Sequence, residues 1–377
     1  MTDFEALVGL NLIPEIGSVR LNKLLERFTT PGNILQSSPH ELQQVMGIGP
    51  AIAGHICSIR ESEIKKELSA AAALGLSVVS LDHPDYPHHL KHIPDPPLVI
   101  YVKGAFSCAD ACAIAIVGSR RPSLYGGEAA ERFGRELSMR KVTVVSGMAK
   151  GIDTSAHNGA LKAKGRTIAV MGSGFGQIYP PENRRLAERI AENGAVISEF
   201  PVGMQPLKQN FPCRNRIISG LSLGVLVVEA ARNSGALITA QYALEQNRDV
   251  FALPGRIDSL TSCGPHDLIK QGAKLVTCAE DIIEEYASLE SLSRSALAEA
   301  DSRDTSPAGN APPPECLSCA ESVLYTIISQ QPVTVDDLVE KSGRSVGEIA
   351  PALLGLQLRK MIVQLPGKRF ARRPHVS

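Results

Sequence analysis

The sequence contains no tryptophan, and aromatic residues make up only 4% of its 377 positions. It has no run of about 18 apolar residues, the length that a membrane-spanning helix requires, so we expect no membrane span. Residues 1–5 lack the basic and apolar regions with which a secretory signal begins. The eight cysteines are therefore expected to be reduced thiols in a cytoplasmic protein.

Sequence motifs of several enzyme classes are missing as well. There is no GxSxG nucleophile elbow and no HExxH zinc motif, and the nearest match to a Walker A loop, residues 147–151, places lysine before its closing glycine. Cys316 and Cys319 form a CxxC pair without a second pair at a zinc-binding distance, which favours chance spacing over a structural metal. We therefore predict no catalytic residue, no metal and no cofactor.

The charge distribution excludes a uniformly basic nucleic-acid-binding protein but is compatible with one that has local basic regions. The 39 basic and 39 acidic residues balance, so the chain is not a histone-like polycation. Basic residues nevertheless outnumber acidic ones in 113–200 and in 316–377, whereas the remaining segments together are net acidic. A polyanionic partner is therefore expected at the middle and at the C-terminal part of the chain.

The segment 76–285 alternates short apolar runs with helical patterns. From Ala113 onward most of the runs are near-continuously apolar, which is typical of parallel strands that are buried on both faces. This βαβ rhythm predicts an α/β domain with an extended Rossmann-like, doubly wound and mostly parallel sheet. The expected strands are 76–80, 98–102, 113–117, 142–145, 167–171, 195–197, 225–228, 250–253 and 274–276.

The N-terminal segment 1–75 has helical patterns throughout. Two turns, 13–17 and 46–50, lie between short amphipathic stretches, as in helix-hairpin-helix or SAM-like domains. A glycine in such a turn either leaves amide N–H groups free to face a phosphate or simply caps a helix. Because this segment is net acidic, we favour capping over direct DNA contact.

The C-terminal part divides into a linker and a small domain. Residues 286–315 are rich in Ser, Ala and Pro and are predicted to be disordered. Residues 316–377 show three helical patterns followed by a hairpin, which is the order of a winged helix. The third helix, 346–359, is unusually apolar, and basic residues gather at its end and on the wing. The sequence leaves open whether this domain binds DNA or protein.

Glycine, hydroxyl and basic residues follow three of the expected strands. These candidate phosphate-binding residues are Gly118, Ser119 and Arg120, then Ser146, Gly147, Lys150 and Gly151, and then Gly172. Glycine lets a phosphate approach the backbone, and hydroxyls, helix N-terminal amides and cations bind its oxygens. No acidic residue follows the second strand to hold a ribose, which argues against a dinucleotide cofactor. Three such loops at neighbouring strand ends predict a polyphosphate track.

Two further stretches extend the predicted site. Residues 208–216 combine cations with one aromatic ring, a pairing that follows phosphates and stacks on unpaired bases. The candidates there, together with two residues after the strand at 225–228, are Lys208, Phe211, Arg214, Asn215, Gly235 and Thr239. In a competing interpretation Phe211 is a core residue and the arginines pair with Glu199 or Glu229. Arg216 is the residue for which we favour that structural role.

Taken in order, these motifs resemble the DNA-processing protein A (DprA/Smf) family. They run from 118–120 through 146–153, 172–174, 179–180, 198–199 and 211–216 to 229–239, and the flanking segments match the longer members. The resemblance implies a non-catalytic homodimer, paired through the Rossmann-like domain, that binds and protects single-stranded DNA in natural transformation or recombination and loads the RecA recombinase. It also implies that Arg120, Lys150 and 208–216 line a DNA-binding pocket.

Two other functions compete with this one. A nucleotide-processing hydrolase of the lysine-decarboxylase-like phosphoribohydrolase group would use the same scaffold, but such enzymes carry a PGGxGTxxE signature that supplies a catalytic glutamate. The nearest stretches here, 233–236 and 254–257, have no equivalent glutamate. In a pure interaction scaffold, the winged helix alone would bind the partner.

Overall fold

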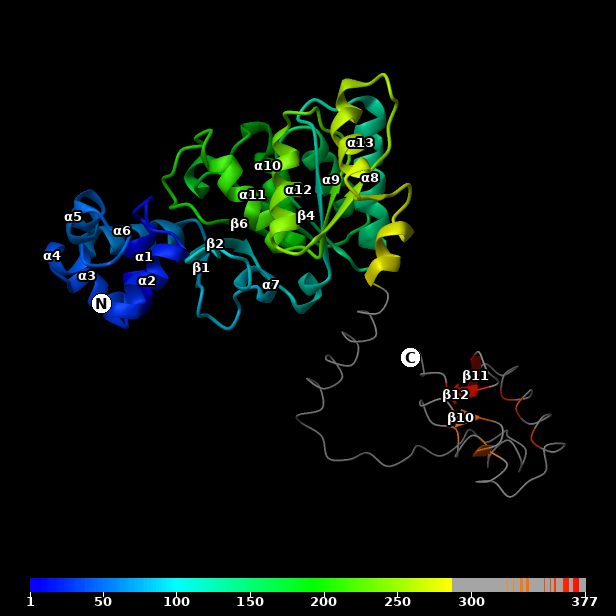
Figure 1. Ribbon diagram of the computed structural model, residues 1–377, viewed down its shortest axis with the longest axis horizontal. Helices are drawn as coiled ribbons and strands as arrows, with labels where there is room; N and C mark the ends of the chain where they lie inside the picture. The colour runs from blue at the N-terminus through cyan, green and yellow to red at the C-terminus, as the bar shows by residue number, and fades with distance from the viewer. Residues whose placement is uncertain are drawn as a thin grey trace. The chain divides into compact units, whose positions relative to one another are not determined.

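The computed structural model describes residues 1–286 and, beyond them, 324, 328, 333–334, 337–338, 349, 353, 356, 362–365 and 369–372. The chain divides into two compact units, Met1–Glu290 and Ser291–Ser377. Figure 1 shows the first unit in blue to yellow, from the N-terminal helices through the large sheet. In the described ranges, no helix combines the length and the apolar character needed to cross a bilayer.

Six helices form the N-terminal part of the first unit. They are α1 (Asp3–Asn11), α2 (Ser18–Phe28), α3 (Pro31–Gln36), α4 (Pro39–Leu42), α5 (Pro50–Ser58) and α6 (Glu61–Ala73). Thr2 starts α1 with a capping box that includes Glu5. Gly17 and Gly49, from the two predicted turns, are the N-cap residues of α2 and α5. The turns thus join short helices as predicted, and both glycines cap the helix that follows.

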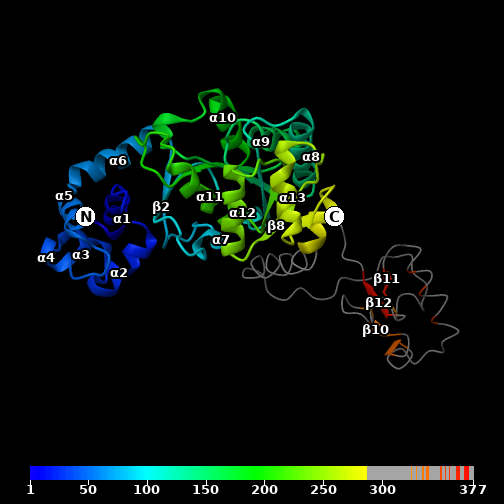
Figure 2. The same cartoon turned by 45° about the horizontal axis from the view of Figure 1, so that its top comes forward.

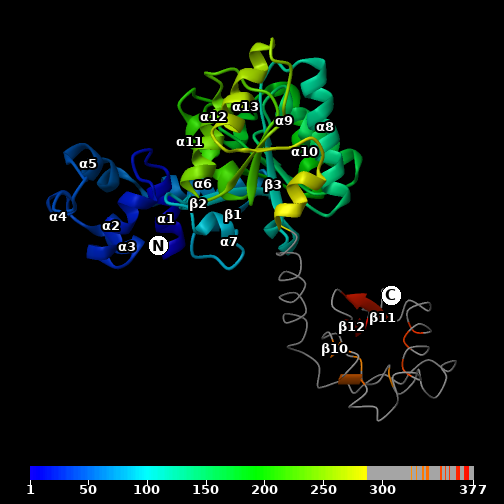
Figure 3. The same ribbon diagram turned by 45° about the vertical axis from the view of Figure 1, so that its right-hand side comes forward.

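These helices share a hydrophobic core with the sheet. Leu10 of α1 and Ile64 of α6 belong to the same buried cluster as Tyr101 and Val196, which lie on strands of the sheet. Figures 2 and 3, two turned views, both show α1 and α6 beside strand β2, and Figure 3 also shows β1 there, at one edge of the sheet. The helical part therefore covers that edge.

The sheet has nine strands, and their order is β1-β2-β6-β5-β4-β3-β7-β8-β9. They are β1 (Ser77–Ser80), β2 (Val99–Gly104), β3 (Ala113–Val117), β4 (Thr143–Ser146), β5 (Thr167–Val170), β6 (Ala195–Ser198), β7 (Gly224–Val227), β8 (Asp249–Ala252) and β9 (Lys274–Leu275). Strands β3 to β9 pair in parallel, and β1 and β2 add an antiparallel edge. The predicted doubly wound, mostly parallel Rossmann-like sheet is confirmed.

Helices cover both faces of the sheet, as the doubly apolar strands require. They are α7 (His88–Lys91), α8 (Leu124–Met139), α9 (Ile152–Lys162), α10 (Arg184–Asn193), α11 (Asn210–Gly220), α12 (Gly235–Glu245) and α13 (Cys263–Lys270), with short 3-10 turns at Cys108–Ala111, Phe175–Gln177, Pro181–Asn183 and Leu260–Ser262. Alternate residues of β3 point to opposite sides: Ala115 packs in the cluster of α11 and α12, and Ile116 in that of α8 and α9.

The second unit contains a three-stranded sheet. Its described strands are β10 (Val333–Thr334), β11 (Ile362–Leu365) and β12 (Arg369–Arg372), in the order β10-β12-β11. The hairpin of β11 and β12 is the predicted one. Ile349, Leu353 and Leu356 of the apolar third helix are buried, so packing accounts for part of its apolar character. Of the predicted linker at 286–315, Tyr286 is helical and packs against the core, and the other residues lie outside the described part of the chain, as do Cys316 and Cys319.

Candidate nucleic-acid interface

A cleft of about 780 Å³ lies at the carboxyl ends of the central strands. Residues 117–120 line it at the end of β3, and residues within 231–239 line it after β7. Strands β3 and β7 are neighbours from which the chain winds in opposite directions along the sheet. Open α/β sheets bind their ligands at such a topological switch point. We call this cavity the switch-point cleft.

Two aromatic rings and a guanidinium group meet in the cleft. The Arg120 guanidinium lies over the Phe211 ring, 5.1 Å from its centroid, and the rings of Tyr179 and Phe211 have centroids 5.7 Å apart. Arg120 is exposed, and Tyr179 remains 43% exposed although it is a large ring. Rings left open beside a guanidinium can stack on unpaired bases while the guanidinium binds phosphate oxygens.

The start of α12 and one lysine form further parts of the wall. Ser234 caps α12 by accepting a hydrogen bond from the amide of Ala236, and Asn233 before it is exposed. A methyl group added to Gly235 would meet no atom within 4 Å, so the helix start borders open space. Lys208, also exposed, lines the cleft from the segment before α11. A helix N-terminus and a cation both favour an anion here.

Arg214 lies beneath these groups and is 4% exposed. Its Nη1 donates to the carbonyl of Gly147 at 2.7 Å and to that of Val170, so it joins the loop after β4 to β5. Burial lowers the pKa of the Arg214 guanidinium to about 10, although the Asp153 carboxylate opposes this shift. Burial likewise raises the pKa of Asp153, which accepts a hydrogen bond from the amide of Ala149 at 3.2 Å.

Two glycines make room for the side chains of α11. A Cβ atom on Gly147 would stand 2.6 Å from the Arg214 guanidinium, and one on Gly172 would stand 2.7 Å from the Phe211 ring. Such distances are far inside van der Waals contact, so these positions admit only glycine without a shift of the neighbour. Their role in this structure is to seat Arg214 and Phe211.

The structure brings most of the predicted site residues together. Those that line the switch-point cleft are Gly118, Ser119, Arg120, Lys208, Phe211, Arg214, Asn215, Gly235 and Thr239. Those that do not line it are Ser146, Gly147, Lys150, Gly151 and Gly172. The predicted residues after β4 and β5 therefore lie behind the cleft, and the same two segments contribute Ala149 and Tyr179 to its wall.

Ser146 and Lys150 have partners within the fold. The Ser146 hydroxyl is buried and donates to the carbonyl of Ile116 at 2.6 Å. The Lys150 ammonium is exposed but lies 2.5 Å from a carboxylate oxygen of Glu182. Gly151 has a φ of 83°, in the left-handed region, which fits the sharp turn into α9.

Sequence reasoning missed some of the lining residues, among them Tyr179, Asn233 and Asp153. Tyr179 follows the glycine-rich loop after β5, and aromatic residues are few in this sequence. An aromatic residue at that position is the sequence feature that could have identified Tyr179 as part of the site. Asp153 is a buried residue in the first turn of α9. Within the described chain, it is the one acidic residue that lines the cleft.

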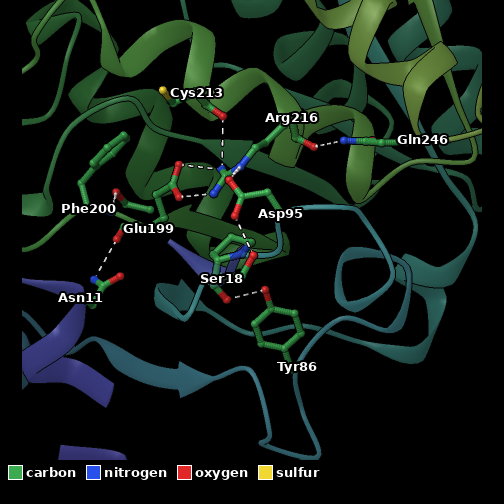
Figure 4. A network of polar contacts seen from close by, with 11 residues as sticks. Asn11, Ser18, Tyr86, Asp95, Glu199, Phe200, Cys213, Arg216 and Gln246 are labelled. Carbon is green, nitrogen blue, oxygen red and sulfur yellow. Dashed lines mark hydrogen bonds and ion pairs between the residues drawn. The ribbon is translucent and has the colours of Figure 1, made fainter. Parts of the chain in front are cut away.

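The competing interpretation of the arginines holds for Arg216. Its guanidinium forms two hydrogen bonds to Glu199, at 2.8 and 2.6 Å, and one to Asp95 at 3.3 Å (Figure 4). Glu229 instead accepts hydrogen bonds from the amide and the hydroxyl of Ser123. Arg214 and Arg216 therefore have different surroundings although they lie on the same helix.

Comparisons with known proteins agree with this architecture. A family model described as DNA recombination-mediator protein A matches residues 77–287, and one described as the DprA winged helix domain matches residues 307–368. The Smf protein of Synechocystis is 35% identical to this chain, over 95% of the chain and 96% of its own length.

Two solved structures are similar as well. DNA processing protein A from Streptococcus pneumoniae aligns with a TM-score of 0.65 at 37% identity, over 76% of this chain and 98% of that one. Its counterpart from Helicobacter pylori aligns with a TM-score of 0.51 at 29% identity, over 56% of this chain and 96% of that one. The chain therefore belongs to the DNA recombination-mediator protein A (DprA/Smf) family.

Proposed function

We propose that this chain binds single-stranded DNA in the switch-point cleft. The observation that carries the proposal is the group formed by Arg120, Phe211 and Tyr179, in which a guanidinium and two accessible rings share one cavity. An unpaired strand offers phosphates and bases side by side, and this group matches both. The Helicobacter pylori relative, described by its single-stranded DNA binding mode, supports the proposal.

The lining residues divide into two roles. Arg120, Lys208 and the start of α12 would bind phosphates, and Phe211 and Tyr179 would stack on bases. Arg214 is buried and bonded to carbonyl groups, so we assign it to holding the loops in place. Lys150 would contribute only after leaving Glu182.

The cleft favours binding over hydrolysis. A phosphoribohydrolase needs a carboxylate that is free to act on the substrate. Asp153, the acidic residue of the cleft lining, accepts a backbone hydrogen bond beside the buried Arg214. We therefore propose a non-enzymatic role, and release of ribose phosphate from nucleoside monophosphates would contradict it.

The wider role rests on family membership. We propose that the chain acts in the cytoplasm, protects incoming single strands during natural transformation or recombination, and loads the RecA recombinase onto them. Addition of the protein should then speed RecA assembly on strands that are already coated by a single-strand-binding protein. If RecA assembly is not faster with the protein present, RecA loading is ruled out, but the proposal of DNA binding still stands.

We further propose a homodimer formed through the Rossmann-like domain. Leu244 and Leu275 are 53% and 47% exposed, and Leu275 belongs to β9 at the edge of the sheet. Leu244 also lines a depression of about 300 Å³ with Leu268. An edge strand beside exposed leucines suits pairing with a second copy. Leu244→Asp should yield monomers in sedimentation experiments.

The primary test is the binding of oligo-dT at increasing salt. Phosphate contacts release counterions, so the affinity should fall steadily as salt rises. Affinity that is independent of salt, or equal affinity for duplex and single strand, would contradict the proposal.

A further inference from the structure

Helix α11 presents different side chains to the cleft and to the two acidic residues that border the helical domain. Phe211, Arg214 and Asn215 line the switch-point cleft, whereas Arg216 contacts Glu199 and Asp95. The residues before α11, in the segment that follows β6, belong to no helix or strand. Backbone hydrogen bonds to the loop after β5 hold this segment, core packing of Ile217 and Ile218 holds α11, and the contacts of Arg216 add to them.

The contacts of Arg216 extend to the N-terminal helices (Figure 4). Asp95, which binds Arg216, also accepts a hydrogen bond from the Ser18 hydroxyl at 2.6 Å, and Ser18 is the first residue of α2. The backbone carbonyl of Glu199 accepts a hydrogen bond from Asn11, the last residue of α1, at 3.1 Å. One guanidinium is thus linked to both helices that flank the first turn.

The pair of Arg216 with Glu199 is shielded from water, whereas the side chain of Asp95 is 43% exposed. The side chains of Arg216 and Glu199 are 12% and 14% exposed, and Ser18 is 1% exposed. Burial raises the pKa of the Glu199 carboxyl. Burial alone would lower the pKa of the Arg216 guanidinium, but the carboxylates of Glu199 and Asp95 outweigh this effect and raise it. A buried ion pair adds little to the net stability of a protein. The planar, two-pronged contact between an arginine and a carboxylate instead fixes how the two side chains are oriented.

We propose that Arg216 is a positioning residue through which the N-terminal helical domain sets the placement of α11, and with it Phe211 and the preceding Lys208. This inference rests on the proposed DNA binding by the switch-point cleft. The helical domain then contributes to DNA binding by holding the cleft in shape, without touching the strand itself. The turn at 13–17 fits that role, because Gly17 faces Asp95, with the nearest carboxylate oxygen 3.4 Å from where its Cβ would be.

The test compares two ion pairs of the same two-pronged geometry, in which the arginine side chains are 12% exposed for Arg216 and 30% exposed for Arg166. Arg166 forms a matching two-pronged pair with Asp110, at 2.9 and 2.8 Å, next to Thr143 and Thr167 at the opposite, amino ends of the strands. Arg216→Met and Arg166→Met should both unfold at lower denaturant concentration. Only Arg216→Met should also bind oligo-dT more weakly, by about tenfold, since coupling through packed contacts has this size.

The salt dependence separates positioning from contact. Arg120→Ala should lower the slope of log K against log salt by about one, whereas Arg216→Met should leave the slope unchanged, because Arg216 releases no counterion. A lowered slope in Arg216→Met, or an affinity loss that Arg166→Met shares, would overturn the inference. The proposed site is tested separately, because it is contradicted if Arg120→Ala also binds like the wild type.

A milder variant covers the case in which Arg216→Met does not fold. Ser18→Ala combined with Asn11→Ala removes the hydrogen bonds that join Asp95 and Glu199 to the helical domain. It leaves in place the pair of Arg216 with Glu199 and the hydrogen bond from the Val202 amide to Glu67. We expect this double variant to bind oligo-dT about threefold more weakly at an unchanged salt slope. Wild-type affinity in the folded double variant would overturn the inference.

Discussion

The guanidinium of Arg120 lies 5.1 Å from the centroid of the Phe211 ring, although the two residues come from different strand-to-helix connections. The ring in turn rests on Gly172, where no side chain could fit without displacing it. Cation–π contacts of this kind hold an arginine in place without using its N–H donors. Arg120 is therefore oriented and still free to bind phosphate.

Replacing Arg120 by alanine should weaken oligo-dT binding by about 1–3 kcal/mol, the usual scale for a charge-assisted contact. Fluorescence anisotropy at several salt concentrations measures both the affinity and its salt slope. Arg121→Ala is the matched control, because Arg121 is the next residue, is exposed and does not line the cleft. Equal losses in the two variants would show a diffuse charge effect and would contradict the site.

The two predicted lysines should differ. Lys208 lines the cleft, whereas the ammonium of Lys150 is bound by Glu182 at 2.5 Å and lowers the pKa of that carboxyl. Lys208→Ala should therefore cost about 1 kcal/mol of binding free energy or more, and Lys150→Ala distinctly less. Glu182→Gln, which frees Lys150, should not weaken binding. A larger loss from Lys150→Ala would assign the loop after β4 to the contact surface.

Much of the fold follows from the sequence because each central strand is apolar on both faces. The expected strand at 113–117 coincides with β3 for this reason. The apolar pattern does not mark the start of α8, which begins at Leu124 because Ser123 caps it. Such a cap depends on one hydrogen bond and leaves little trace in an apolar pattern.

The sequence predicts which residue types form the site, but it does not predict which of their polar groups form hydrogen bonds within the protein. Arg120 and Phe211 belong to different motifs, and both line the cleft as expected. Ser146 has the same hydroxyl as Ser119, but a distant backbone carbonyl, that of Ile116, accepts its hydrogen bond. Which polar groups find partners inside the protein is decided by tertiary packing, and a motif does not encode it.

Gly172→Ala should weaken DNA binding without removing any group that touches DNA. The new Cβ would stand 2.7 Å from the Phe211 ring and would push it out of its place beside Tyr179. We expect a loss close to that of Phe211→Ala, about 1–3 kcal/mol for one stacked base, with little change in salt slope. Gly203→Ala is the control, since a Cβ at Gly203 meets no atom within 4 Å. Wild-type affinity of Gly172→Ala would argue against stacking on Phe211.

Acid should destabilise the Rossmann-like domain through His157. This histidine is 0% exposed, its Nδ1 lies 2.7 Å from the Thr167 hydroxyl, and burial lowers its pKa from 6.5 to about 3. Between these values the unfolded chain binds a proton that the folded protein does not, so stability falls as the pH falls. The loss should approach ~1.4 kcal/mol for each pH unit below the ordinary value.

The variant His157→Asn isolates this effect, because an asparagine amide can still donate toward Thr167 but does not titrate. Burial raises the pKa of Asp153 and of Glu199, which favours the folded state as the pH falls. Both acids are present in the variant as well, so their contribution cancels in the difference between the two proteins. Urea unfolding at pH 7, 6, 5 and 4 should give a wild-type curve that drops more steeply than that of His157→Asn. Parallel curves would mean that His157 is protonated in the folded protein or reaches solvent before the domain unfolds.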